Sequence, residues 1–217
     1  MATATRNRPR RLDRRTRSAR AEGLDGRTAL LEAAMDVFAE RGYRDASVDE
    51  IAERAGYSKG AIYFHFSGKD DLFFALLEER IDGPMREAIK LLESAPPEDD
   101  MALEANRHFV ELVSRQRELL LLDHEYRSHA IRDSRLRARY VKREAKLRSV
   151  LAKGLQARVK HLGAPPVAAP EQVATALLSL AFGLAQEKLI QPDAVPDELL
   201  GDMFALIYAG HVARAQR

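Results

Sequence analysis

The stretch from Ser47 to Phe66, SVDEIAERAGYSKGAIYFHF, constrains the fold of this chain more than any other feature. Ser47 and Glu50 form an S-x-x-E capping box, in which each side chain accepts a hydrogen bond from the other residue's amide, so a helix is expected to begin here. Apolar residues then recur at helical spacing until Gly56, which tolerates the positive φ of a helix end. Ser58 is a suitable cap for a second helix. The stretch therefore predicts two short helices joined by a tight turn.

The second of these helices has an outward face suited to nucleic acid. Ile62 and Phe66 lie four residues apart and are expected to face inward, which leaves hydroxyl, ammonium and ring groups pointing outward. Such groups are poor material for a helical bundle, but they can contact phosphates and base edges. Two short helices with a glycine turn form a helix-turn-helix, whose second helix meets the bases with its N-terminal part. An ordinary hairpin inside a helical bundle is the alternative interpretation.

At this point the chain resembles the TetR/AcrR family of bacterial transcriptional regulators. The resemblance is specific from about residue 24 to residue 84, and beyond that it rests on an all-helical layout of suitable length. It is carried by Ser47, Ile51, Ala52, Ala55, Gly56, Ser58, Lys59, Gly60, Tyr63, His65, Phe66, Lys69, Asp70, Asp71 and Leu72. It implies an all-α protein in which a three-helix DNA-binding domain precedes a helical effector-binding and dimerisation domain. The expected boundaries are a basic arm at 1–23, the DNA-binding domain at 24–84 with its helix-turn-helix at 47–66, and the C-terminal domain at 85–217.

The expected partner is double-stranded DNA with a palindromic operator. Two identical chains would place two recognition helices about 34–36 Å apart, so the site should be an inverted repeat. The residues expected to hold phosphates are Ser47, Lys59, Tyr63, His65 and Lys69. The residues expected nearest the bases are Tyr57, Ser58, Gly60, Ala61 and Phe64. Gly60 lets the backbone approach, whereas Ala61 and Phe64 can touch a thymine methyl group.

Charge is unevenly distributed along the chain. The formal net charge is +2, but residues 1–20 hold eight arginines and one aspartate. This arm has almost no apolar residues, so it is expected to be disordered in the free protein. It is a candidate to follow the phosphates or enter the minor groove. The alternatives are a solubilising tail and a start codon assigned upstream of the true one, and an arginine-rich start also mimics an organelle transit peptide.

The C-terminal half is expected to be a series of helices without strands. Gly83 and Pro84 predict a kink or break in the fourth helix, which is the covalent route between the two halves. Pro170 and Pro196 open the last two helices. The first of these is apolar nearly all round, which favours packing on a second subunit, and the resemblance implies a homodimer formed by both. The expected interface residues are Leu177, Leu178, Ala181, Leu184, Met203, Phe204, Ile207 and Tyr208.

The resemblance also implies a small-molecule effector bound among the fourth to eighth helices, whose binding lifts repression. One sequence does not define such a pocket or its ligand. The residues considered for its lining are Phe109, Tyr126, Tyr140, Phe182 and Gln186, each of which also suits the core or the surface.

Other chemistry finds little support in the sequence. There is no cysteine, hence no disulfide framework and no thiolate metal site. His124 and His129 are five residues apart, about 140° around a helix, so they do not form the four-residue zinc motif. No unbroken run of 18 apolar residues and no secretory signal occurs. A soluble cytoplasmic protein with no cofactor and no metal is expected; an enzyme and a helical interaction protein that does not bind DNA are the alternatives.

Overall fold

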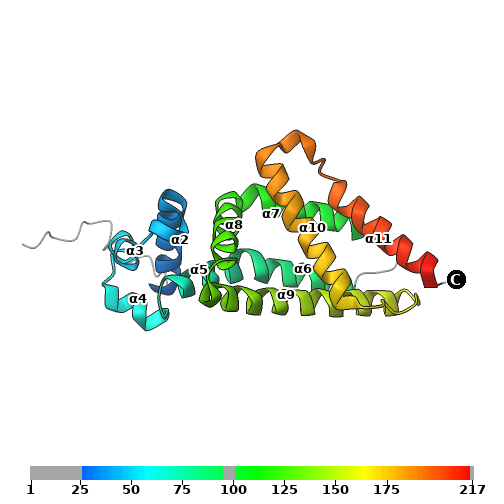
Figure 1. Ribbon diagram of the computed structural model, residues 1–217, viewed down its shortest axis with the longest axis horizontal. Helices are drawn as coiled ribbons and strands as arrows, with labels where there is room; N and C mark the ends of the chain where they lie inside the picture. Colours follow the sequence, from blue (N-terminus) through cyan, green and yellow to red (C-terminus); the bar gives the residue numbers. More distant parts are fainter. Residues whose placement is uncertain (1–25, 95–100, 216–217) are drawn as a thin grey trace, which may run out of the picture. The chain divides into compact units, whose positions relative to one another are not determined.

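The computed structural model describes residues 26–94 and 101–215, and within these ranges all regular structure is helical (Figure 1). The predicted all-α class is therefore confirmed. By the contacts between its residues the chain divides into two compact units, and their described parts are 26–75 and 76–215. The basic arm expected at 1–23 lies outside the described residues.

The first unit contains the predicted helix-turn-helix. Its helices are α2 (Gly26–Asp45), α3 (Val48–Ala55), α4 (Lys59–His65) and the greater part of α5 (Lys69–Leu77). Gly42 breaks the helical winding near the end of α2, where φ is 75° and ψ is 170°. Helix α2 packs on α3, and α3 packs on α4, with Ile51 of α3 and Ile62 of α4 fully buried. The three helices thus share one small core.

Aromatic rings join α2 to α5. The centroids of Phe38 and Phe73 lie 6.0 Å apart in an edge-to-face arrangement, and Tyr43 lies 5.2 Å from Phe73. Tyr43 also donates a hydrogen bond to Asp70 at the start of α5. Rings in such geometries add to the stabilisation that burial provides. The start of α5 is therefore fixed to the core that carries α4.

A π-helical segment takes the place of the expected kink. The segment η1 (Glu78–Asp82) follows α5 directly and leads into α6 (Gly83–Ser94). The amide of Gly83 donates to the carbonyl of Glu78, five residues back, and a Cβ at Gly83 would lie 2.8 Å from that oxygen. Only glycine fits there without a shift of backbone. Pro84 follows, so the helix changes its winding where the sequence predicted an interruption.

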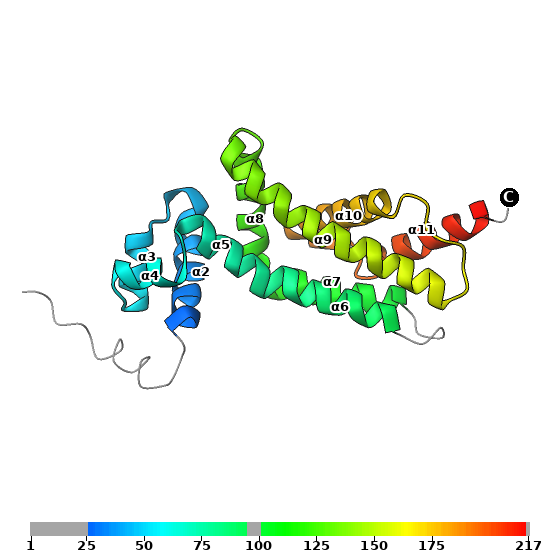
Figure 2. The same cartoon turned by 90° about the horizontal axis from the view of Figure 1, so that it is seen from below.

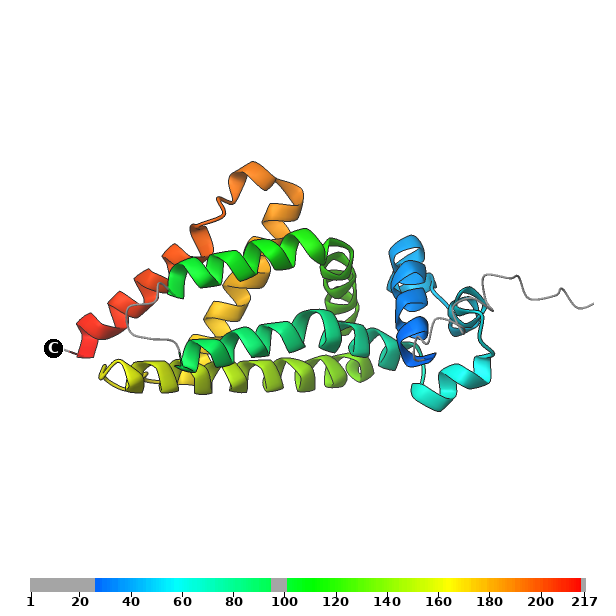
Figure 3. The same cartoon turned by 180° about the vertical axis from the view of Figure 1, so that it is seen from behind.

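The remaining helices of the second unit follow in order. They are α7 (Met101–Arg115), α8 (Arg117–Ala130), α9 (Ser134–His161), α10 (Pro170–Ile190), the short 3-10 turn η2 (Pro192–Ala194) and α11 (Leu199–Ala215). Helix α9 runs alongside α6 and also packs on α10, whereas α11 packs on α7 (Figures 1 and 2). Seen from behind, α6 and α7 run in opposite directions (Figure 3). A core cluster that includes Ile89, Leu151 and Leu177 joins α6, α9 and α10.

Two features of this half are not evident from its sequence. Asp123, in the middle of α8, is buried and forms an ion pair with Arg143. Helix α10 lacks an unbroken apolar run, yet within the described ranges it is the one helix long and apolar enough to cross a bilayer. That is weak evidence for a membrane, since helices of soluble proteins pass the same test.

Candidate nucleic-acid interface and apolar cavity

The caps predicted for α3 and α4 are present. Ser47 has extended backbone angles, and its Oγ accepts a hydrogen bond from the amide of Glu50 at 3.1 Å. Gly56 ends α3 in the left-handed conformation, with φ of 72°. Ser58 Oγ accepts from the amide of Ala61 at 3.3 Å. The return half of the capping box is replaced, because the Glu50 carboxylate accepts from Arg41 Nε at 3.2 Å. Local signals thus position the N-terminus of α4.

Helix α4 turns its predicted inner residues inward and its rings outward. Ile62 and Phe66 are buried, whereas the exposed fraction is 54% for Tyr63 and 83% for Phe64. The His65 ring is exposed and lies edge-to-face with Phe64, with 5.0 Å between centroids. A largely exposed phenylalanine beside two other rings is an unusual surface for a protein to leave uncovered. Such a face suits stacking and apolar contacts with bases.

Lys59 has a partner that the sequence analysis missed. Its Nζ lies 2.8 Å from Asp49 Oδ1 and 3.0 Å from Oδ2, with both side chains largely exposed. This hydrogen bond, with the attraction between the charges, raises the pKa of Lys59 above its usual value. The pair links α3 to the first turn of α4. A phosphate bound at Lys59 would have to compete with the carboxylate.

This pairing predicts opposite effects of two neighbouring substitutions on DNA affinity. Lys59→Ala removes a cation and should weaken binding to all duplexes about equally, by roughly 3–10-fold for each subunit engaged. Asp49→Ala should tighten binding, because it removes a competing anion and releases the ammonium group. Fluorescence anisotropy with a labelled duplex, repeated at several salt concentrations, measures both. Weaker binding by Asp49→Ala would show that the carboxylate positions Lys59 instead of competing for it.

Lys69 and Tyr57 have internal contacts that their expected role did not anticipate. Lys69 Nζ donates to the carbonyls of Arg44 at 2.7 Å and Ala46 at 2.9 Å, and it lies 4.9 Å from the centre of the Tyr43 ring. It therefore closes the turn between α2 and α3. Tyr57 is half-buried, and a Cβ at Gly26 would lie 3.4 Å from its hydroxyl oxygen. Direct DNA contacts by Lys69 and Tyr57 stay predictions.

The described part of the first unit is acidic. Between residues 26 and 75 there are six lysines and arginines and nine aspartates and glutamates. Two of the arginines are paired with carboxylates, Arg54 with Glu40 and Arg41 with Glu50. The positive charge that would attract a polyanion is therefore concentrated in the arginine-rich first twenty residues, which lie outside the described ranges.

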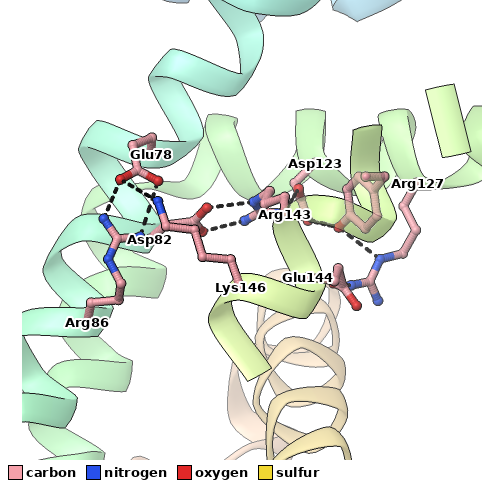
Figure 4. A network of polar contacts seen from close by, with 9 residues as sticks. Glu78, Asp82, Arg86, Asp123, Arg127, Arg143, Glu144 and Lys146 are labelled. Atoms are coloured by element: carbon pink, nitrogen blue, oxygen red, sulfur yellow. Dashed lines mark hydrogen bonds and ion pairs between the residues drawn. The ribbon is translucent and has the colours of Figure 1, made fainter. Parts of the chain in front are cut away.

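A buried polar network fixes η1 to α8 and α9 (Figure 4). Arg143 donates from Nε and Nη2 to Asp82 at 2.8 and 2.7 Å, and from Nη1 to Asp123 at 2.9 Å. The Tyr140 hydroxyl donates to Asp123 at 2.9 Å. The side chain of Arg143 is 8% exposed. Burial lowers its pKa, but the attraction and hydrogen bonds of Asp123 and Asp82 outweigh this and leave the pKa raised, so the guanidinium stays charged.

The network extends to both sides of Arg143. On one side, Arg127 Nε donates a hydrogen bond to the Tyr140 hydroxyl at 3.1 Å, and Arg127 Nη2 donates to Glu144 at 2.6 Å. The pKa of Tyr140 is raised, mainly because the hydroxyl is buried. On the other side Glu78, the first residue of η1, is paired with Arg86 and lies 3.5 Å from Lys146 Nζ. Both ends of the π-helical segment are therefore held by ion pairs (Figure 4).

An apolar cavity of about 800 Å³ lies within the second unit, between α6 and α7. Helices α9, α10 and α11 contribute the rest of its lining. The lining residues from these three helices are Leu151, Leu177, Leu178, Ala181, Leu200 and Phe204. Of the five residues considered for an effector pocket, Phe109 alone lines this cavity.

The other four belong to the contact between α8, α9 and α10 and do not line this cavity, so their role in effector binding stays a prediction. Tyr126 is fully buried and stacked on Tyr140, with 5.9 Å between ring centroids. Phe182 is buried beneath the guanidinium of Arg127. Gln186 forms a hydrogen bond of 2.8 Å with His124 Nδ1. Aromatic and polar composition alone did not distinguish core contacts from cavity lining.

Several expected interface residues also face their own subunit. Leu177 is buried in the core, and Leu178, Ala181 and Phe204 line the cavity. Leu184 and Met203 are partly buried, Ile207 is exposed, and the side chain of Tyr208 lies outside the described ones. The sequence pattern showed that α10 is apolar all round but not which stripe its own subunit covers. The least covered stripe contains the exposed Ala176, Ser179 and Gly183 and the half-buried Leu180 and Leu184.

Comparison with known proteins identifies the first unit. Residues 30–76 match the family model described as bacterial regulatory proteins, tetR family. The activator FasR of Mycolicibacterium smegmatis is 39% identical over 103 residues, which cover 46% of this chain and 47% of FasR. The chain thus spans about half the length of this relative.

Solved structures match more of the chain at lower identity. One of them is SmeT, the repressor of a multidrug efflux pump of Stenotrophomonas maltophilia, in its complex with triclosan. SmeT is 22% identical to this chain with a TM-score of 0.62, and the match covers 82% of this chain and 88% of SmeT. The fatty acid degradation regulator FadR of Bacillus halodurans is 19% identical with a TM-score of 0.64, and the match covers 82% and 91%. These likenesses concern the fold. The matched residues 30–76 show that the first unit carries a DNA-binding helix-turn-helix of the tetR family of bacterial regulatory proteins, and the fold of the rest resembles that of regulators of this family.

Proposed function

We propose that this protein is a transcriptional repressor that binds an inverted-repeat operator as a homodimer and is released by a small-molecule effector. The observation that carries the proposal is the exposed face of α4, where Tyr63, Phe64 and His65 stand beside an N-terminus capped by Ser58. A short helix with this surface enters a major groove with its first turns toward the bases. Such a target implies a cytoplasmic protein that acts by binding and not as an enzyme.

The homodimer is supported by the uncovered surface of the last two long helices. Only 22% of the most apolar window of α10 is buried within the subunit. On α11 the exposed fraction is 62% for Leu206 and 39% for Ile207. A second copy can cover both helices at once, and small residues such as Ala176 and Gly183 permit close approach of two helices. Two recognition helices then face successive major grooves of one duplex.

The effector site is supported by the cavity between α6 and α7. Its volume of about 800 Å³ lies within the range typical of small-molecule sites. Ile81 of η1 and Pro84 and Met85 of α6 line it, so a ligand there contacts the segment that follows α5. A ligand changes operator affinity only if it binds the DNA-bound and the released conformer unequally, and such coupling is typically about 1–3 kcal/mol.

Selection from a random duplex library, followed by binding measurements on the selected sites, tests the proposal. We expect an inverted repeat and one dimer for each site. Phe64→Ala should change the preferred bases in both half-sites, at a cost of about 1–3 kcal/mol for the original sequence. Lys90→Ala, an exposed residue of α6, is the matched control and should leave the profile unchanged. Equal losses on every sequence with Phe64→Ala, or no saturable complex with any duplex, would contradict the proposal.

A further inference from the structure

One charged residue of the cavity lacks an internal counter-charge. Arg80 of η1 is half-buried and lines the cavity, and the described part of the chain offers its guanidinium no hydrogen bond or ion pair. The other charged lining residues are compensated, since Glu111 lies 3.3 Å from Arg115 and Glu104 lies 2.7 Å from Arg107. The described lining therefore holds one positive charge without an internal partner, among mainly apolar residues and charges that are paired.

This charge lies at one end of the cavity. Because α6 and α7 run in opposite directions (Figure 3), η1 and the end of α7 belong to the same end of the cavity, and Arg115 and Gln116 complete it there. From Arg80 the lining continues along α6 to Leu91, roughly 15 Å at the rise of a helix. Between these ends the walls are mainly aliphatic and aromatic. The site is thus long and mainly apolar; Glu104, His108 and Glu111 of α7 also line it, but both glutamates are paired with arginines, so the unpaired cation lies at one end.

We propose that the cavity takes an amphipathic carboxylate, with its carboxylate at Arg80 and its hydrocarbon chain between α6 and α7. This rests on the proposed effector site and names the chemical class of its ligand. A guanidinium matches a carboxylate with two parallel hydrogen bonds, and the match is stronger where water is partly excluded. A cationic ligand would be repelled at that end. A neutral one would leave the half-buried charge without a partner.

The position of Arg80 also relates the ligand to the network in Figure 4. Arg80 lies two residues before Asp82, whose carboxylate is held by Arg143 at 2.7–2.8 Å. A carboxylate drawn to Arg80 therefore acts on a π-helical segment that is tied at both ends. The head group, more than the tail, contacts the element that continues from α5.

Calorimetric titration of the full-length dimer without DNA tests this assignment. The probes are laurate, dodecanol and dodecyltrimethylammonium, which share a chain and differ in the charge of the head, each kept below its micelle concentration. We expect laurate to bind most tightly. Arg80→Gln should weaken laurate by about tenfold or more, as for loss of a hydrogen bond between charged groups, and change dodecanol by less than about twofold. Lys90→Gln, which removes an exposed cation of α6 that does not line the cavity, is the matched control and should leave the affinity for laurate unchanged.

Three results would overturn the assignment: tightest binding by the ammonium probe, no binding of laurate, or equal losses of laurate and dodecanol in Arg80→Gln. Thermal melts of the variants without ligand exclude a folding defect as the cause of a loss. Adding each probe to the preformed operator complex separates this inference from the proposed function. Laurate that binds through Arg80 but leaves the operator complex intact would contradict effector release while leaving the ligand class standing.

Discussion

Deletion of residues 2–20 is expected to lower operator affinity by a hundredfold or more and to flatten its dependence on salt. The described part of the first unit has three more acidic than basic residues, whereas the deleted segment holds eight arginines. Each phosphate neutralised contributes about 0.9 to the slope of log affinity against log salt concentration. If three arginines of each arm contact phosphates, the deletion removes six phosphate contacts from the dimer. The magnitude of the slope should then fall by roughly five.

A matched deletion separates this charge effect from a general effect of truncation. Residues 2–5 are Ala, Thr, Ala and Thr, so their removal shortens the arm without changing its charge. That variant should bind as the full chain does. Replacement of the eight arginines by lysine should keep most of the salt dependence. It should lose only the part of the affinity that depends on guanidinium geometry in the minor groove. An unchanged slope after deletion of residues 2–20 would remove the arm from the interface and leave α4 and its neighbours to supply all the phosphate contacts.

The sequence predicted the parts of the site that depend on neighbouring residues. Ser47, Gly56 and Ser58 act within four residues of themselves, so their caps could be inferred from spacing alone and are present in the structure. The inward side of α4 followed from the separation of Ile62 and Phe66. Recognition of the family depended on the same local pattern. That is why the helix-turn-helix was predictable in detail, while for the second unit the helices were predictable but most contacts between them were not.

The missed features join residues far apart in the chain. Asp49 reaches Lys59 across a turn, and Arg143 reaches Asp82 across 61 positions. No periodicity encodes such pairs, because each partner alone looks like a solvated charge. The covered stripe of α10 and the cavity lining likewise depend on which helices become neighbours. Arg80 would have passed for an ordinary surface arginine without the cavity beside it.

Arg143→Ala is expected to lower the free energy of unfolding by about 3–5 kcal/mol, the usual cost of removing one partner from a buried ion pair. Asp82 and Asp123 are 3% and 4% exposed, so the substitution leaves two carboxylates buried without their cation. Urea unfolding followed by far-ultraviolet circular dichroism, at one fixed protein concentration, measures the change. Lys146→Ala, whose exposed ammonium lies 3.5 Å from Glu78, is the control and should change stability by about 0.5 kcal/mol or less.

A compensated variant shows whether the loss arises from unpaired charge or from lost packing. Combining Arg143→Met with Asp82→Asn and Asp123→Asn removes the charges together and keeps similar volumes, so most of the lost stability should return. Its operator complex should nevertheless respond less to ligand, because η1 is no longer held by ion pairs at Asp82. A triple variant as unstable as Arg143→Ala would show that the shape of the arginine, not its charge, stabilises this region. Restored stability with an unchanged ligand response would mean that η1 transmits the effect of the ligand without its anchor at Asp82.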